Sequence, residues 1–141
     1  MKLESKFYNE LKRITPQIRW TRIENTSVFG TPDLLGYNDS GRFFTVELKV
    51  SKSNKVNLSP HQISFHITHP KNSFILVKSL GQRSVKLYSG SVVRELVASG
   101  LELEAWRLKL SSSFFSVSHD AYSIPLRSIF QYRLLSNNLE A

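Results

Sequence analysis

A chain of 141 residues with 40% hydrophobic and 21% charged side chains is long enough to bury one core, so we expect a single globular domain over 1–141 rather than two domains or a disordered chain. The absence of cysteine excludes disulfides, thiolate zinc sites and cysteine nucleophiles. The formal net charge of +8 favours a polyanionic partner such as nucleic acid, because contacts between basic side chains and phosphates release counterions, although a solvated basic face would carry the same charge.

Hydrophobic periodicity predicts the elements of the first half of the chain. Apolar residues recur at helical spacing from Leu3 to Ile14, and Pro16 ends the pattern. Three strands are then expected, over 19–23, 32–37 and 42–50. The turn 38–41, Asn-Asp-Ser-Gly, joins the last two as a hairpin, because these residues favour tight turns.

The second half predicts a helix from Leu58 to about Thr68, with Ser59 as its N-cap and Pro60 in its first position. The remaining expected elements are strands over 73–80 and 84–90, a helix over 91–100, helix or strand over 101–110, a loop or edge strand over 111–118, and a final helix over 124–135. This order predicts an α/β fold in which helices flank a central mixed sheet.

The strand over 42–50 has two unequal faces. Alternation places its apolar residues on one face and Glu47 and Lys49 on the other. One interpretation is an edge strand with a solvated outer face. The other is a site, because the hairpin brings Asp33 about level with Glu47, and two close carboxylates repel unless a cation lies between them. Carboxylate oxygens suit Mg²⁺, and Lys49 could orient or deprotonate a water, which together favour phosphodiester hydrolysis.

The spacing of these residues resembles a known motif. Pro32-Asp33, followed after 13 residues by Glu47-Leu48-Lys49, resembles the PD-(D/E)XK motif of restriction-endonuclease-like nucleases. Within that superfamily the likeness is to small phage and archaeal Holliday-junction-resolvase-like enzymes and the VRR-NUC group, and it covers about residues 1–80. It implies an αβββαβ core, Mg²⁺ with Mn²⁺ as a substitute, cleavage of branched DNA such as Holliday junctions, and a homodimer.

The resemblance also assigns roles to individual residues. It implies metal ligation by Asp33, Glu47 and the backbone carbonyl of Leu48, with Lys49 as the catalytic lysine. A helical Glu completes the site, directly or through water; Glu4 and Glu10 compete for this role, and Glu4 matches the family pattern better. The further expected residues are Gln62, which would position water or phosphate, Lys52 and Lys55, which would contact the DNA backbone, and Glu24, as an additional acid or a turn residue.

Other functions remain open on the sequence alone. The chain could be a non-catalytic nucleic-acid-binding module with a nuclease-like fold, or a restriction-type or nicking nuclease. His66 and His69 could share one helical face, but no third metal ligand follows them at recognisable spacing. We therefore expect these two residues and His61 at the surface or facing DNA rather than on a metal. Trp20, Trp106 and the pair Phe114-Phe115 are expected in the core. No apolar stretch is long enough for a membrane span, and the first residues form a charged helical pattern rather than a signal peptide, so we expect a cytoplasmic protein without a membrane partner.

Overall fold

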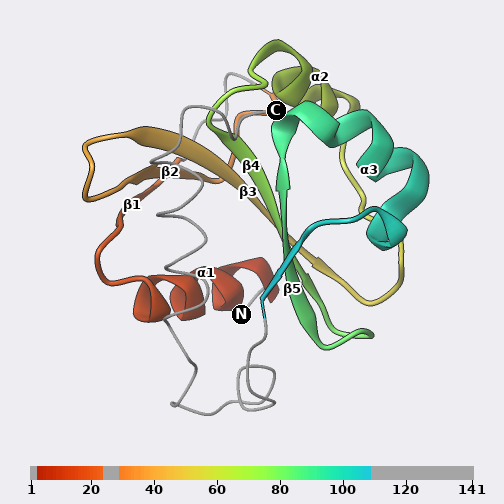
Figure 1. Ribbon diagram of the computed structural model, residues 1–141, viewed down its shortest axis with the longest axis horizontal. Helices are drawn as coiled ribbons and strands as arrows, with labels where there is room; N and C mark the ends of the chain where they lie inside the picture. Colours follow the sequence, from red (N-terminus) through yellow and green to blue (C-terminus); the bar gives the residue numbers. More distant parts are fainter. Residues whose placement is uncertain (1–2, 24–28, 109–141) are drawn as a thin grey trace.

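The computed structural model describes residues 3–23 and 29–108. These residues form a six-stranded mixed sheet, in the order β1-β2-β3-β4-β5-β6, with helices on both faces (Figure 1). The α-helices and strands are α1 (Leu3–Ile14), β1 (Arg19–Arg22), β2 (Leu34–Tyr37), β3 (Phe43–Ser51), α2 (Pro60–Thr68), β4 (Ser73–Ser79), β5 (Ser84–Ser89), α3 (Val93–Ser99) and β6 (Trp106–Leu108). The predicted α/β class is confirmed.

Two apolar clusters hold the layers together. On one face of the sheet, α1 buries Phe7, Leu11 and Ile14 among the apolar side chains of β3, β4 and β5. On the other face, α3 packs on a second cluster that includes Ile75, Val77, Tyr88 and Leu96. Truncating a core side chain of this size to alanine costs about 2–5 kcal/mol. The periodicity that predicted α1 therefore marks the stripe by which the helix is fixed to the sheet.

Strand β3 lies in the middle of the sheet. It pairs antiparallel with β2 on one side and parallel with β4 on the other. The parallel connection runs through α2, as a parallel pair of neighbouring strands requires. The edge-strand interpretation of 42–50 is therefore wrong, and any charge on the inner part of β3 lies inside the protein.

The hairpin turn sets the register of β2 against β3. The Asn38 side-chain oxygen accepts hydrogen bonds from the backbone N–H groups of Ser40 and Arg42, at 3.1 and 3.0 Å, and Gly41 takes a positive φ of 77°. The ladder then pairs Leu34 with Val46. The predicted register, with residue 33 level with residue 47, is confirmed at this last pair of the ladder.

Most element boundaries differ from the predicted ones by one or two residues, most informatively at the start of β2 and in the segment after α3. Strand β2 begins at Leu34 rather than at residue 32, because Pro32 has no N–H to donate to the ladder and Asp33 makes other contacts, described below. The segment 101–110, for which the sequence allows both helix and strand, begins within a 3₁₀ turn at Gly100–Glu102 and continues into β6. The elements expected over 111–118 and 124–135, together with Phe114 and Phe115, lie outside the described residues. Trp20 is half-buried against Phe44, with ring centroids 5.5 Å apart, as predicted.

Across residues 3–23 and 29–108, no helix has the length and apolarity needed to cross a membrane.

Candidate active site

Asp33 lies where β2 and β3 separate. Its side-chain Oδ2 accepts a hydrogen bond from the backbone N–H of Leu48 at 2.8 Å. Its backbone carbonyl accepts one from the N–H of Ile23, also at 2.8 Å. The carboxylate therefore continues the β2–β3 ladder by one step beyond Leu34, and this contact fixes its position beside β3.

Glu47 is buried next to Asp33. Its side chain is 1% exposed, and Oε1 has no hydrogen-bond partner among the described residues. Burial, and after it the hydrogen bond and negative charge of Asp33, raise the pKa of Glu47 to about 10, while Lys49 partly opposes the shift. Without a cation, the pair of carboxyl groups therefore retains a proton at neutral pH.

The donor set at this point fits a hard divalent cation. A buried carboxylate oxygen without a partner, next to a second carboxylate, is costly unless a proton or a cation neutralises it. Oxygen ligands are what Mg²⁺ and Mn²⁺ prefer. In the part of the chain that the structure describes, no three acidic or histidine side chains are grouped closely enough to hold one ion. A cation here would thus rely on two carboxylates, backbone oxygen and water.

The backbone of Leu48 adds an oxygen on the same side. The N–H of Thr45 donates to the carbonyl of Asn72, on the β4 side. The odd-numbered residues of β3 therefore direct their backbone N–H and C=O groups to β4, and the even-numbered residues direct theirs to β2. Leu48 belongs to the second set, as its hydrogen bond to Asp33 shows. Its carbonyl therefore points toward the position where β2 has already ended, next to Asp33.

Lys49 and Glu4 line one pocket. This pocket has a volume of about 330 Å³, and the first turn of α1, the end of β3 and the loop after it form its walls. Glu4 is exposed, and its charge contributes a small further increase in the pKa of Glu47. Lys49 is half-buried and follows Glu47 by two residues on the same face of β3.

Glu10 has a different partner. Its Oε2 forms an ion pair with Lys78 Nζ at 2.8 Å, and both side chains are largely buried. Lys78 lies on β4, beneath α1. Of the two competing helical acids, Glu4 faces the pocket with Lys49, and Glu10 fastens α1 to the sheet.

Gln62 caps α2, the helix that follows β3. Its side-chain Oε1 accepts a hydrogen bond from the N–H of Ser59 at 2.9 Å, while Ser59 Oγ accepts one from the N–H of Gln62 at 3.2 Å. This reciprocal capping box was readable as Ser-x-x-Gln, and the predicted N-cap at Ser59 is confirmed. The amide oxygen of Gln62 is thus engaged in the fold, and its role toward water or phosphate stays a prediction.

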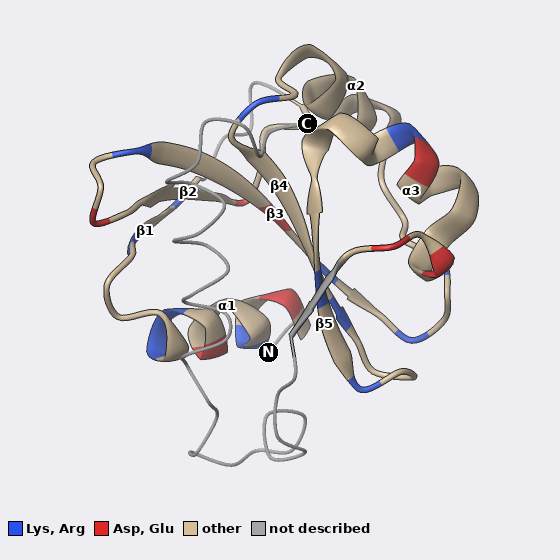
Figure 2. Cartoon of the chain, in the orientation of Figure 1, with Lys and Arg blue, Asp and Glu red and all other residues tan. Residues whose placement is uncertain are grey.

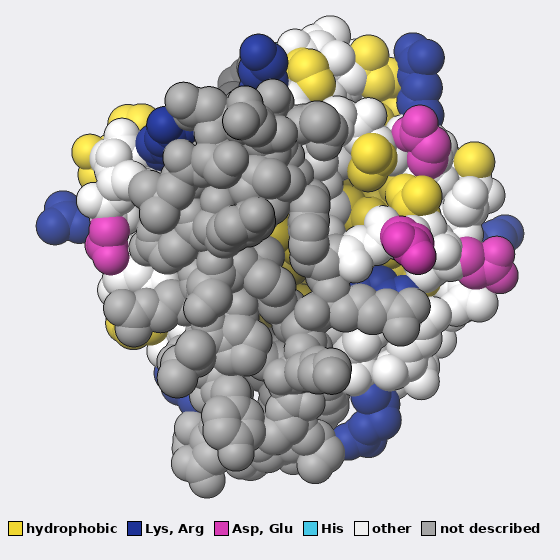
Figure 3. All heavy atoms as spheres, viewed as in Figure 1, with side chains coloured by type: hydrophobic (Ala, Val, Ile, Leu, Met, Phe, Trp, Pro, Cys, Tyr) yellow, Lys and Arg dark blue, Asp and Glu magenta, His cyan; other side chains and the backbone are white. Residues whose placement is uncertain are grey.

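Basic residues surround the pocket on one side. Lys52 and Lys55 are exposed in the loop after β3 and line the pocket with Lys49. Figure 2 shows basic residues in blue on this loop and on the turn between β4 and β5. Acidic side chains gather instead around α3, as Figure 3 shows in magenta. A polyanion is therefore better accommodated at the β3 loop than at α3.

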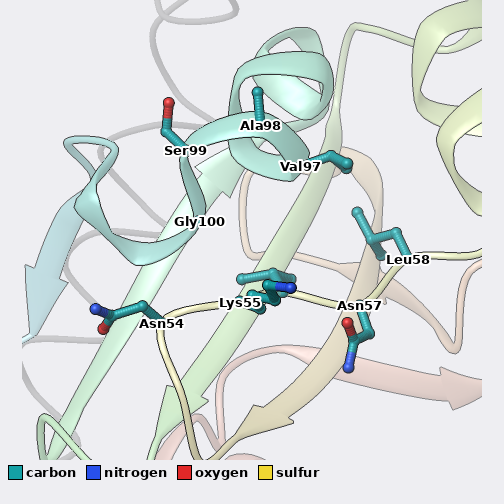
Figure 4. Close-up of a pocket in the computed structure, with 9 residues that line it drawn as sticks. Asn54, Lys55, Asn57, Leu58, Val97, Ala98, Ser99 and Gly100 are labelled. Atoms are coloured by element: carbon teal, nitrogen blue, oxygen red, sulfur yellow. The ribbon is translucent and has the colours of Figure 1, made fainter.

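A second cavity, of about 340 Å³, lies between residues 54–58 and the end of α3. Figure 4 shows Lys55 on one wall and Val97 on the other. None of its lining residues is acidic. It therefore lacks the carboxylates that a metal-dependent reaction would need.

Among the described residues, His61, His66 and His69 are not grouped as ligands of a metal ion. His66 is 1% exposed, and its Nδ1 lies 2.7 Å from Ser73 Oγ. Burial, with a smaller effect from the charge of His69, lowers the pKa of His66 to about 4. The expectation of surface histidines is wrong for His66, because this face of α2 packs against β4. His61 and His69 are exposed as expected, and Glu24 lies outside the described residues.

Comparison with known proteins shows a likeness in structure. No protein-family model and no curated protein matches the chain. Among solved structures, Hjc, a Holliday junction resolvase from the hyperthermophilic archaeon Archaeoglobus fulgidus, is similar with a TM-score of 0.51 and 14% sequence identity. The similarity covers 64% of this chain and 75% of that one. It shows that the chain has the fold of that resolvase, consistent with the predicted restriction-endonuclease-like core.

Proposed function

We propose that the protein is a metal-dependent endodeoxyribonuclease that hydrolyses phosphodiester bonds in branched DNA. The observation that carries this proposal is the pair Asp33 and Glu47, held together at the point where β2 leaves β3. A buried carboxylate such as that of Glu47, held beside the second carboxylate of Asp33, destabilises the protein unless it has a ligand. The chain is basic and has the fold of a junction resolvase. A divalent cation that takes part in phosphodiester hydrolysis is therefore the ligand that best accounts for this carboxylate pair.

Asp33, Glu47 and the Leu48 carbonyl would hold Mg²⁺, or Mn²⁺ in its place, with Glu4 acting through a water ligand. When bound, the ion neutralises charge on the scissile phosphate and lowers the pKa of a bound water. Glu47 would hold the ion as a carboxylate, with its proton released to the solvent. The Lys49 ammonium, in the pocket beside this pair, orients the attacking water and stabilises the charge that develops on the phosphate oxygens.

Basic residues and the fold support the choice of substrate, and this substrate in turn favours a homodimer. Lys52 and Lys55 would contact the DNA backbone beside the cleaved bond, and Gln62, on the neighbouring helix, would help to position water or phosphate. Cutting a four-way junction requires two incisions in different strands, which a twofold homodimer provides. The fold of a junction resolvase favours this substrate over a continuous duplex.

The test is a cleavage panel. The purified protein is incubated with a four-way junction, a flap and a linear duplex, in Mg²⁺, Mn²⁺ or EDTA. We expect cleavage of the branched DNAs with metal and none in EDTA or with Asp33→Asn, whereas Asp39→Asn, at an exposed turn position, serves as the matched control and keeps activity.

Other results would point to the alternatives. Salt-sensitive DNA binding that persists in Asp33→Asn, without cleavage of any substrate, would show a non-catalytic binding module. Cleavage of the linear duplex in preference to both branched DNAs would show a restriction-type or nicking nuclease.

A further inference from the structure

Phe29 is an exposed aromatic ring in the loop that leads to Asp33. Its side chain is 75% exposed, the largest fraction among the large hydrophobic side chains of the described residues. Its ring stacks on the His61 ring, with centroids 5.2 Å apart and planes inclined by 27°. Because His61 covers one face of the ring and most of the side chain remains exposed, the opposite face is open to solvent.

The neighbouring glycine holds this ring in place. Gly30 has a φ of 83°, and a Cβ added to it would lie 2.3 Å from the carbonyl oxygen of His61. The loop therefore lies directly on the first turn of α2, a contact that only glycine permits. Single exposed hydrophobic residues are common on protein surfaces, but they are not usually fixed in this way. Backbone contact and ring stacking together give Phe29 a defined orientation.

The Phe29 ring lies close to the carboxylate pair Asp33 and Glu47. Phe29 and Asp33 are four residues apart, so their Cα atoms are separated by at most about 14 Å. Stacked nucleotides advance about 3.4 Å each along a strand. A base on the Phe29 ring would therefore lie within about four nucleotides of a phosphate at the Asp33–Glu47 pair.

We propose that Phe29, backed by His61, is a stacking platform for an unpaired nucleobase next to the cleavage site; this inference rests on the proposed nuclease function. Every base has a π-face, so stacking on an aromatic side chain tolerates any sequence. Bases at a branch point or in a flap can leave the helical stack, whereas those of a continuous duplex remain stacked on their neighbours. The platform thereby selects branched DNA by the availability of a base, and the phosphate contacts bind any DNA.

The test compares binding to branched and continuous DNA without cleavage. Affinities for the four-way junction, the flap and the linear duplex are measured by fluorescence anisotropy in EDTA. A second junction carries 2-aminopurine at its branch point, to report a change in base stacking. The variants are Phe29→Ala, which removes the ring, Phe29→Leu, which keeps an apolar side chain, and Phe29→Trp, which keeps stacking.

Phe43→Ala is the matched control. Phe43 is also exposed, at 59%, and also contacts an aromatic ring, that of Tyr37, but it lies at the other end of the β2–β3 hairpin. We expect Phe29→Ala and Phe29→Leu to weaken junction and flap binding about 5- to 100-fold, with duplex binding almost unchanged. Phe29→Trp and Phe43→Ala should bind like the wild type, and the 2-aminopurine signal should be lost only in the first two variants.

The outcomes separate this inference from the proposed function. If the wild type cleaves branched DNA and Phe29→Ala binds junction and duplex like the wild type, the platform is wrong and the nuclease function stands. If Phe29→Ala weakens binding to junction and duplex equally, Phe29 contributes a general contact and the platform is again wrong. If the wild type neither binds nor cleaves any of the three DNAs, both proposals fail.

Discussion

The carboxylate of Asp33 accepts a hydrogen bond from the backbone N–H of Leu48 at 2.8 Å, and so takes the place in the ladder that β2 would have filled with a backbone carbonyl. One side chain therefore ends the β2–β3 pairing and brings a carboxylate to Glu47. The same contact leaves the Leu48 carbonyl beyond the end of β2. The end of the β2–β3 ladder and the composition of the candidate site thus both depend on Asp33.

Asp33→Asn should separate structure from activity. The asparagine Oδ1 can accept the same hydrogen bond from Leu48, so we expect the melting temperature to change little. Loss of a charged metal ligand should lower cleavage of a four-way junction by roughly 100-fold or more. Thermal unfolding and single-turnover cleavage check the two halves of this prediction. A variant that unfolds at a much lower temperature would mean that the charge of Asp33, and not only its hydrogen bond, holds the hairpin.

Glu47→Gln should stabilise the metal-free protein at neutral and alkaline pH. Because the pKa of Glu47 is raised in the folded state, the folded protein keeps a proton that the unfolded chain releases above a pH of about 4.5. The free energy of unfolding of the wild type should therefore fall as the pH rises, by up to about 1.4 kcal/mol per pH unit, until the folded protein also loses this proton. Glutamine is neutral at every pH, so the free energy of unfolding of the variant should lack this pH-dependent decrease.

Thermal unfolding from pH 5 to pH 9 in EDTA measures the difference between the two proteins. Mg²⁺ should raise the melting temperature of the wild type at pH 8, by binding the ionised pair, and should have little effect on Glu47→Gln. Parallel pH profiles for the two proteins, or equal stabilisation of both by Mg²⁺, would contradict the role of Glu47.

The two helical acids should respond in opposite ways. Glu10→Gln removes one partner of a largely buried ion pair with Lys78 and should cost about 3 kcal/mol of unfolding free energy, without a specific effect on cleavage. Glu4→Gln is at an exposed position and should leave stability nearly unchanged while reducing cleavage. Urea denaturation and junction cleavage on both variants decide the assignment, and the reverse pattern would transfer the role in the site to Glu10.

His66 should make the protein sensitive to mild acid. Its pKa is lowered to about 4 in the folded state, so between about pH 6.5 and pH 4 the unfolded chain binds a proton that the folded protein does not. The free energy of unfolding should therefore decrease as the pH falls through this range, by about 1.6 kcal/mol between pH 6.5 and pH 5. Urea denaturation at the two pH values should show a smaller decrease for His66→Gln. His61→Gln, at an exposed position on the same helix, is the control and should behave like the wild type.

Local patterns were sufficient to predict most of the elements and the hairpin register. The apolar stripe of α1, the Asn-Asp-Ser-Gly turn and the Ser59 cap each depend on residues within a few positions of one another, and the structure has all three. The turn in particular aligned Asp33 with Glu47, because an antiparallel hairpin has one register once its turn is set. The sequence by itself therefore determined the pairing of the two candidate ligands.

Tertiary structure decided how these residues behave, because burial and partners depend on segments far apart in the chain. Strand β3 is central only because β4 pairs with it, and this burial raises the pKa of Glu47. Glu10 meets Lys78, 68 residues away, which leaves Glu4 in the pocket. The contact of Phe29 with His61 likewise joins a loop to a helix across the hairpin between them. Helical and strand periodicity describe which face a side chain occupies, whereas the charge that it carries and the neighbours that it meets are set when those faces pack together.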